Sequence, residues 1–327
     1  MNRQTPPCLA RVFRCGEIES EHFGHIVIAG ADGTVHFSAG ERDVRVFLRS
    51  AAKPVQAVPL VEQNIPHAFG LSDKEMALAC ASHNGEDFHI AAAASMLQKI
   101  GLSKDDLQCG VHRPLGVEVG CVEESGHYDV LQNNCSGKHA AMLAACVRSG
   151  LSTTTYLSKN HPHQQDILTR ISHYGNVSKE KIAIGIDGCS APVFNLPLQN
   201  LAILYARLAD RSLPGYRCFR YMVQNPEMVG GSTRFDTTFM QAMAGSAIAK
   251  IGAEGLQCVA IEKPEPLGVI VKISDGNNRA APPVMLAIMR KMGLLPDAAA
   301  EKMPAYRAPE LRNHRGVSVG KIEAVSF

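Results

Sequence analysis

Ser50 and Lys53 are the first residues in the sequence whose types and spacing suggest catalytic chemistry. A serine and a lysine three residues apart lie on the same face of a helix. A lysine that burial or a neighbouring cation keeps neutral can take the serine proton and so activate the hydroxyl as a nucleophile. A bare S-x-x-K also occurs by chance on solvated helix faces, so the pair is a hypothesis that needs structural context.

Two later features supply part of that context. Ser82-His83-Asn84 is an S-x-N triplet, and Lys263 follows a strand-like run. A serine motif, then S-x-N, then a strand lysine is the motif order of the serine β-lactamases and penicillin-binding proteins. Lys263 is followed by Pro264 instead of completing the usual K-T-G, which argues against a β-lactam substrate. The order therefore indicates an acyl-transfer serine enzyme.

Three further segments carry polar residues in loops. Residues 133–139 form the densest polar segment and precede an apolar helix over 140–149, although a loop that merely caps this helix is the alternative interpretation. Residues 187–192 follow a predicted buried strand over 182–186, where polar side chains commonly line a cleft. Arg234, in a glycine-led loop, could hold a carboxylate, but such an arginine more often forms a surface or structural ion pair.

The elements that must position these residues alternate between strands and helices. Residues 24–29 and 34–38 read as a hairpin around Asp32-Gly33, and two further strands are predicted over 257–262 and 267–274. Strands at both ends with helices between them predict an α+β fold (an α/β sandwich). We expect an antiparallel sheet built from both termini, packed helices and a helical central insertion, as in the serine β-lactamases. Residues 1–327 are expected to form one domain of two lobes that share a core.

Composition restricts the function further. The chain has 327 residues, 46% of them hydrophobic, and a net charge of +2, which gives no reason to expect a nucleic-acid or membrane partner. No apolar run is long enough to span a membrane, and the N-terminus lacks the apolar core of a signal peptide, which predicts a cytoplasmic location. The ten scattered cysteines are expected to be free thiols.

Six segments of the sequence together resemble one known family, the Rhizobium etli type-II or class 3 L-asparaginases. They contain residues 49–54, 81–86, 134–139, 185–192, 234–237 and 262–264, in order and with their spacing intact. The resemblance implies hydrolysis of L-asparagine to L-aspartate and ammonia, a serine β-lactamase-like fold and a homodimer. It also implies two Ser-Lys pairs, which here correspond to Ser50 with Lys53 and Ser82 with Lys263.

The same resemblance implies a zinc ion in each subunit, held by Cys135, Lys138 and Cys189. Spacing alone does not predict this set, because zinc ligands are normally Cys, His, Asp or Glu, and His139 would be the ordinary third ligand. A lysine binds a metal only after losing its proton, which requires a strongly lowered pKa. We expect the metal to orient the substrate rather than to activate water.

The predicted mechanism begins with attack by Ser50 on the amide carbonyl after its proton passes to neutral Lys53. Ser82 and Lys263 then relay a proton to the leaving ammonia, and water hydrolyses the acyl-enzyme. Five residues are candidates for substrate contacts. Asp187 is expected to bind the α-ammonium group of the substrate. His83, Asn84 or His139 is expected to bind its α-carboxylate, and Arg49 is a further candidate contact beside Ser50.

Three alternatives stay open at the level of sequence. The protein could be a zinc-dependent amidohydrolase acting on a related small amide, with zinc-bound hydroxide as the nucleophile. It could be a non-catalytic amino-acid-binding protein, although binding alone needs no poised amine. It could also be a cysteine amidase that uses Cys135 and His139.

Overall fold

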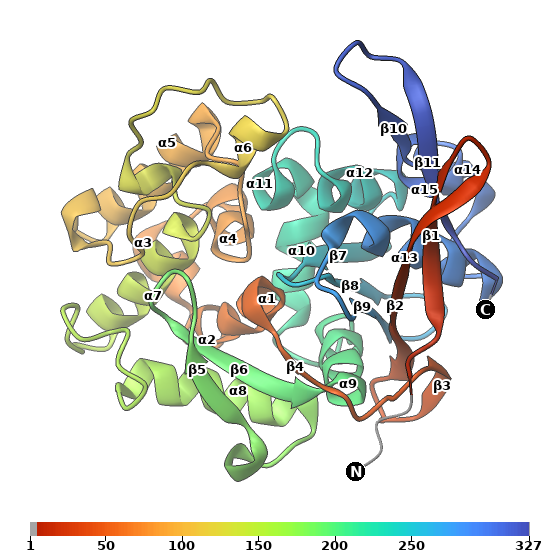
Figure 1. The fold of residues 1–327 in the computed structure, drawn as a ribbon. Coiled ribbons are helices and arrows are strands. Elements are labelled where there is room, and N and C mark those ends of the chain that lie inside the picture. The colour runs from red at the N-terminus through yellow and green to blue at the C-terminus, as the bar shows by residue number, and fades with distance from the viewer. Residues whose placement is uncertain (1–4, 327) are drawn as a thin grey trace.

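The computed structural model describes residues 5–326 of the chain (Figure 1). Residues 1–4 and 327 lie outside the described part, so the predicted lack of a signal-peptide core falls partly on residues without a structural description.

An antiparallel sheet of eight strands organises the fold. Its strand order is β10-β11-β1-β2-β9-β8-β7, and β3 pairs with β2 beside this path. The strands β1, β2 and β3 come from the start of the chain and β10 and β11 from its end, and Figure 1 shows β1 beside β11. The strands are β1 (Cys8–Arg14), β2 (Glu17–Gly30), β3 (Val35–Ala39), β7 (Ala247–Ile251), β8 (Leu256–Ile261), β9 (Leu267–Ile273), β10 (Glu310–Arg312) and β11 (Ser318–Ala324).

The predicted Asp32-Gly33 turn joins β2 to β3. Gly33 has a φ of 97°, a left-handed conformation that costs glycine little, and Asp32 Oδ1 accepts a hydrogen bond of 2.9 Å from the Thr34 N–H. The hairpin predicted from this sequence is therefore confirmed.

Helices cover the centre of the sheet. Every residue of β8 is buried, and α9 (Leu198–Leu208) and α13 (Ala281–Lys291) both pack on β9. Gly268 of β9 makes the approach of α9 possible, because a Cβ at this position would lie 1.9 Å from the Ala202 carbonyl oxygen. The apolar central strands thus form the buried middle of the core.

Most of the remaining helices form the expected central insertion between β4 (Arg45–Phe47) and β7, at the left and centre of Figure 1. The segments after β4 and before β7 contain α1 (Lys53–Gln56), α2 (Val58–Glu62), α3 (Ile65–Phe69), α4 (Asp73–Ala79), α5 (Asp87–Lys99), α6 (Leu115–Glu118), α7 (Ser136–Arg148), α8 (Pro162–Gly175), α10 (Tyr216–Gln224), α11 (Pro226–Gly230) and α12 (Phe235–Ala242). Two short helices, α14 (Asp297–Ala300) and α15 (Pro304–Arg307), follow α13.

A second sheet of three strands delivers the chain to the Ser50 motif. Its order is β4-β6-β5, with bounds Arg45–Phe47, Pro192–Pro197 and Ala183–Ile186. The expectation that residues 182–186 form a buried strand is wrong, because β5 is an edge strand and Ile186 is 83% exposed. The Leu48 N–H donates to the Phe194 carbonyl, and this bond fixes the chain directly before Arg49 and Ser50.

The predicted α+β class and the β-lactamase-like arrangement are confirmed by this strand order and by the helical insertion. Among the described residues, no helix has both the length and the apolar character needed to cross a membrane.

Candidate active site

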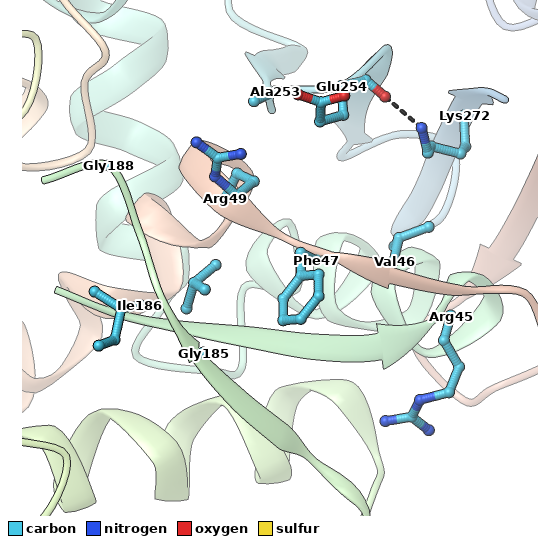
Figure 2. Close-up of a pocket in the computed structure, with 11 residues that line it drawn as sticks. Arg45, Val46, Phe47, Arg49, Gly185, Ile186, Gly188, Ala253, Glu254 and Lys272 are labelled. Atoms are coloured by element: carbon cyan, nitrogen blue, oxygen red, sulfur yellow. Dashed lines mark hydrogen bonds between the residues drawn. The ribbon is translucent and has the colours of Figure 1, made fainter. Parts of the chain in front are cut away.

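A cavity of about 580 Å³ lies where segments distant in the sequence meet. Its wall includes side chains from the turn after β4, the loop after α4, the segment before α7, the loop after β5 and the segment before α12: Ser50, Ser82, Asn134, Cys135, Cys189 and Arg234. A neighbouring cavity of about 410 Å³ shares Arg49 and Gly188 with this wall. Figure 2 shows the Arg49 side chain between the Gly188 backbone and the loop of Ala253 and Glu254.

Two buried lysine amines meet at the hydroxyl of Ser82. Lys53 Nζ lies 2.9 Å and Lys250 Nζ 2.8 Å from Ser82 Oγ. Lys53 Nζ also donates to the Asn134 carbonyl at 3.0 Å, and Lys250 Nζ to the Ile251 carbonyl at 3.0 Å. A hydroxyl between two amines can accept from one and donate to the other, so the three groups can pass a proton.

Three different elements hold this network. Lys53 begins α1 directly after the short 3₁₀ turn Arg49–Ala52, and Lys250 interrupts the apolar run of β7. Ser82 follows α4 in a loop that its own N–H ties to the Val229 carbonyl at 3.1 Å. All three side chains are almost fully buried, with exposed fractions of 2% or less.

Burial and mutual repulsion lower the pKa of both amines. Burial lowers the pKa of Lys250 to about 7, with further lowering by Lys53 and Arg234 and an opposing effect of the Asp236 carboxylate. Burial also lowers the pKa of Lys53, and the nearby Lys138 adds to this, while the Cys135 thiolate opposes it. At neutral pH a large fraction of Lys250 is therefore an uncharged base.

Ser50 faces the same cavity but is more accessible than Ser82. It is half-buried and lines the wall, and its peptide oxygen accepts the Lys53 N–H. Both residues are described, and no hydrogen bond joins Ser50 Oγ to Lys53 Nζ, which binds Ser82 instead. Arg49, directly before Ser50, has a φ of 47°, a strained conformation of the kind that clusters at functional sites.

The predicted pairing of Ser82 with Lys263 is corrected by the structure. Lys263 is exposed in the turn between β8 and β9, whereas Lys250 of β7 contacts Ser82. Lys250 stands opposite Cys258 in the sheet, and Lys263 lies five residues beyond Cys258. Five residues of extended chain span about 16 Å, so Lys263 is at the other end of the strand pair.

Cys135 and Cys189 lie on the wall of the cavity, and Lys138 is buried beside them. Lys138 Nζ lies 2.9 Å from Cys189 Sγ, and both thiol groups are 5% exposed. A hydrogen bond from Cys189 and the charges of Lys53 and Lys138 hold the pKa of Cys135 well below its ordinary value. Burial lowers the pKa of Lys138, but the Cys135 and Cys189 sulfurs outweigh burial and raise it.

This donor set fits a zinc ion in its chemistry. Two thiolates are preferred zinc ligands, and Lys138 can supply a third donor atom once it loses its proton. Within residues 5–326 no three His, Cys, Asp or Glu side chains converge as a metal site, so a metal at this wall would require the lysine.

The predicted carboxylate contacts of His83, Asn84 and His139 are also corrected, because none of the three has any exposed surface or lines the cavity. His83 Nδ1 accepts the Gly85 N–H, so Nε2 carries the proton and donates to Ser136 Oγ at 2.9 Å. His139 Nδ1 lies 2.7 Å from the Tyr156 hydroxyl. His83 and His139 therefore brace the loops behind the site, and burial holds their pKa values well below the ordinary value.

Arg49 and Asp187, the other two predicted substrate contacts, do line the cavity. Arg49 Nε donates to Asp187 Oδ1 at 2.5 Å, so the two charges pair with each other. Burial raises the pKa of Asp187, but Lys138, the Gly188 N–H and Arg49 outweigh burial and keep the carboxylate ionised.

Sequence reasoning missed Lys250 and Glu118. Lys250 carried a detectable signal, because a lysine within the buried run Ala247–Ile251 needs a specific partner. Glu118 lines the cavity from the end of α6, and its position in a glycine-rich loop gave no sign of this.

A family model matches nearly the whole of this chain. The family model described as L-asparaginase II matches residues 10–324. A search of curated proteins gave no match.

Several solved structures align with this chain at low identity and with TM-scores below 0.5. The native form of a protein named Mglu aligns with a TM-score of 0.47 and 14% identity over 83% of this chain and 64% of its own, so this chain spans less than two thirds of its length. A β-lactamase from Mycobacterium bovis gives a TM-score of 0.42 and 12% identity over 82% and 94% of the two chains. A probable glutaminase from Bacillus subtilis, complexed with 6-diazo-5-oxo-L-norleucine, gives 0.38 and 10% over 83% and 84%.

Proposed function

Because the chain belongs to the L-asparaginase II family, we propose that it hydrolyses the side-chain amide of L-asparagine to L-aspartate and ammonia. One observation carries the proposal. Two buried amines with lowered pKa values converge on Ser82 Oγ behind a cavity that also exposes Ser50. Such a network can take a proton from an attacking hydroxyl and return it to a leaving amine.

Ser50 is the proposed nucleophile because a substrate can reach it, whereas Ser82 is almost fully buried. Ser50 transfers its proton to neutral Lys53 as its oxygen bonds to the amide carbon. The amide nitrogen then leaves as ammonia with a proton from Ser82, which Lys53 replaces. Water attacks the resulting ester, a proton returns to Ser50, and aspartate leaves.

Lys250 holds Ser82 ready for this relay. Its neutral amine accepts the Ser82 proton while Lys53 donates to the same oxygen, so the hydroxyl keeps a fixed direction. Lys250 thus replaces the exposed Lys263 in the role predicted from sequence.

The proposal includes a zinc ion bound by Cys135, Lys138 and Cys189. When bound, the ion supplies a positive charge that orients the substrate beside Ser50. The three residues are close enough to share one ligand, as the 2.9 Å contact of Lys138 with Cys189 indicates. Without the ion, the raised pKa of Lys138 keeps it an ammonium that neutralises the Cys135 thiolate.

The proposal also includes a homodimer and a cytoplasmic location. The family resemblance supports the homodimer, and light scattering of the purified chain measures the oligomeric state.

An ammonia-release assay tests the function. L-asparagine and L-glutamine are compared, each with and without a metal chelator. Preferential ammonia release from asparagine supports the proposal. Comparable rates with glutamine would contradict asparagine as the preferred substrate. Saturable binding of asparagine without ammonia release would instead favour an amino-acid-binding protein.

A further inference from the structure

The charges on the cavity wall are unevenly paired. Four lining side chains carry a carboxylate or a guanidinium: Arg49, Asp187, Arg234 and Glu118. Arg49 and Asp187 neutralise each other through their 2.5 Å contact. Among the described residues neither Arg234 nor Glu118 forms an ion pair, so they remain as one positive and one negative group on this wall.

Arg234 is held in place by backbone carbonyls. Its Nε donates to the Gly230 carbonyl at 2.8 Å, and its Nη2 donates to the carbonyl of Ser82. Nη1 makes no hydrogen bond with any described residue. Burial lowers the pKa of Arg234, and the Asp236 carboxylate opposes this effect. Because an arginine side chain remains protonated in proteins, a rigid cation with free donors points to an anionic ligand.

Carboxylates near Arg234 are already occupied elsewhere. Asp236 accepts the Ile251 N–H and the Gln257 side-chain amide, each at 2.9 Å. Glu86 accepts the Ser232 N–H at 2.9 Å and the Asn84 side-chain amide at 3.0 Å. Among residues 5–326, no carboxylate oxygen lies within 4 Å of the Arg234 guanidinium.

Glu118 offers the opposite charge at the rim. It is the last residue of α6, its side chain is exposed, and the described residues give it neither an ion pair nor a hydrogen bond. Both Glu118 and Arg234 line the same cavity, so one small ligand can face the two charges.

We propose that Arg234 binds the α-carboxylate of the substrate and Glu118 its α-ammonium, so that the two residues select an amino-acid zwitterion. The proposal rests on the proposed function, because the bound amide must reach Ser50 in the same cavity. Arg49 and Asp187 then orient the loops around Ser50 and do not bind the substrate charges.

Hydrolysis of three amides tests the two contacts separately. L-asparagine carries both charges, 3-aminopropanamide lacks the carboxylate, and succinamate lacks the ammonium. A charged hydrogen bond contributes about 1.5–3 kcal/mol. We therefore expect kcat/KM for asparagine to exceed that for either analogue by about 10- to 100-fold.

Matched variants assign each contact to its residue. In Arg234→Gln the preference for asparagine over 3-aminopropanamide should fall towards one, while the preference over succinamate persists. Glu118→Gln should show the reverse pattern. Arg312→Gln, which removes an exposed ion pair with Glu310 on β10, should leave both ratios unchanged.

A uniform loss of kcat/KM on all three amides in Arg234→Gln would overturn the proposal and leave Arg234 as a structural latch for the Ser82 loop. If that variant does not fold, the affinities of the unmodified protein for L-aspartate, β-alanine and succinate, measured by calorimetry, test the proposal instead. Equal affinities would contradict the charge pair. This titration needs no turnover, so it tests the pair even if asparagine is not hydrolysed.

Discussion

The amine of Lys250 lies 2.8 Å from the Ser82 hydroxyl, although 168 residues separate them in the sequence. The lysine comes from the edge of the main sheet and the serine from the helical insertion, so the contact joins the two halves of the fold. Because Lys53 approaches the same oxygen at 2.9 Å, one hydroxyl links both amines.

Replacing Lys250 should nearly abolish hydrolysis. Lys250→Met removes the base that orients Ser82, and loss of a general acid or base typically costs about 10²- to 10⁴-fold in rate. Lys263→Met is the matched control and should leave kcat/KM unchanged, because Lys263 is exposed away from the cavity. Ammonia release measured for both variants checks this, and the opposite pattern would restore Lys263 as the catalytic lysine.

Activity should rise with pH through about 7. The relay needs Lys250 neutral, and the pKa of Lys250 is lowered to about 7, so the active form gains population as pH increases past this value. A pH profile of kcat/KM with asparagine measures the rising limb. A profile that falls with increasing pH over this range would contradict a neutral amine.

Removing the Asp236 carboxylate should shift that limb to lower pH. Asp236 raises the pKa of Lys250, so Asp236→Asn lowers it further and leaves more neutral amine in acid. The Ile251 N–H keeps an acceptor, and the unpartnered Gln257 Oε1 can accept from the new amide after rotation. Glu310→Gln, on the exposed strand β10, should leave the profile unchanged; a shift to higher pH in Asp236→Asn would refute the coupling.

Ser50 and Lys53 should behave as one unit. Ser50→Ala and Lys53→Met should each reduce kcat by roughly 10³-fold or more, and the double variant should lose little beyond either single one. The comparison requires kcat for all four proteins. Additive losses, or near-normal turnover in Ser50→Ala, would transfer the nucleophilic role to Ser82.

Metal removal should weaken substrate binding more than it slows chemistry. A chelator should raise KM for asparagine while kcat persists, because the serine and not a metal-bound hydroxide attacks. Cys189→Ser should reduce the zinc content per subunit, measured by elemental analysis. Complete loss of kcat that zinc alone restores would favour the zinc-hydroxide mechanism.

Much of the site was predictable because its residues stand in loops with distinctive local patterns. Ser50 and Ser82 were identified from such patterns, and Cys135 and Cys189 through the family resemblance. The structure brings all four to one cavity. The antiparallel sheet was predictable for the same reason, since the Asp32-Gly33 turn and the alternating apolar runs are local signals.

What could not be predicted depends on strand register and burial. The choice between Lys250 and Lys263 is set by the pairing of β7 with β8, which the order of motifs does not encode. His83 and His139 carry functional groups in motif segments, yet they face the protein interior. The Ile182–Ile186 run is apolar enough for a core strand, but as an edge strand it leaves Ile186 in solvent.

Rapid quenching during asparagine turnover, followed by peptide mass spectrometry, tests the central claim most directly. The account predicts an aspartyl ester on Ser50, absent in Ser50→Ala and accumulating in variants that slow deacylation. An ester on Ser82, a thioester on Cys135, or turnover with no covalent intermediate in any variant would contradict it.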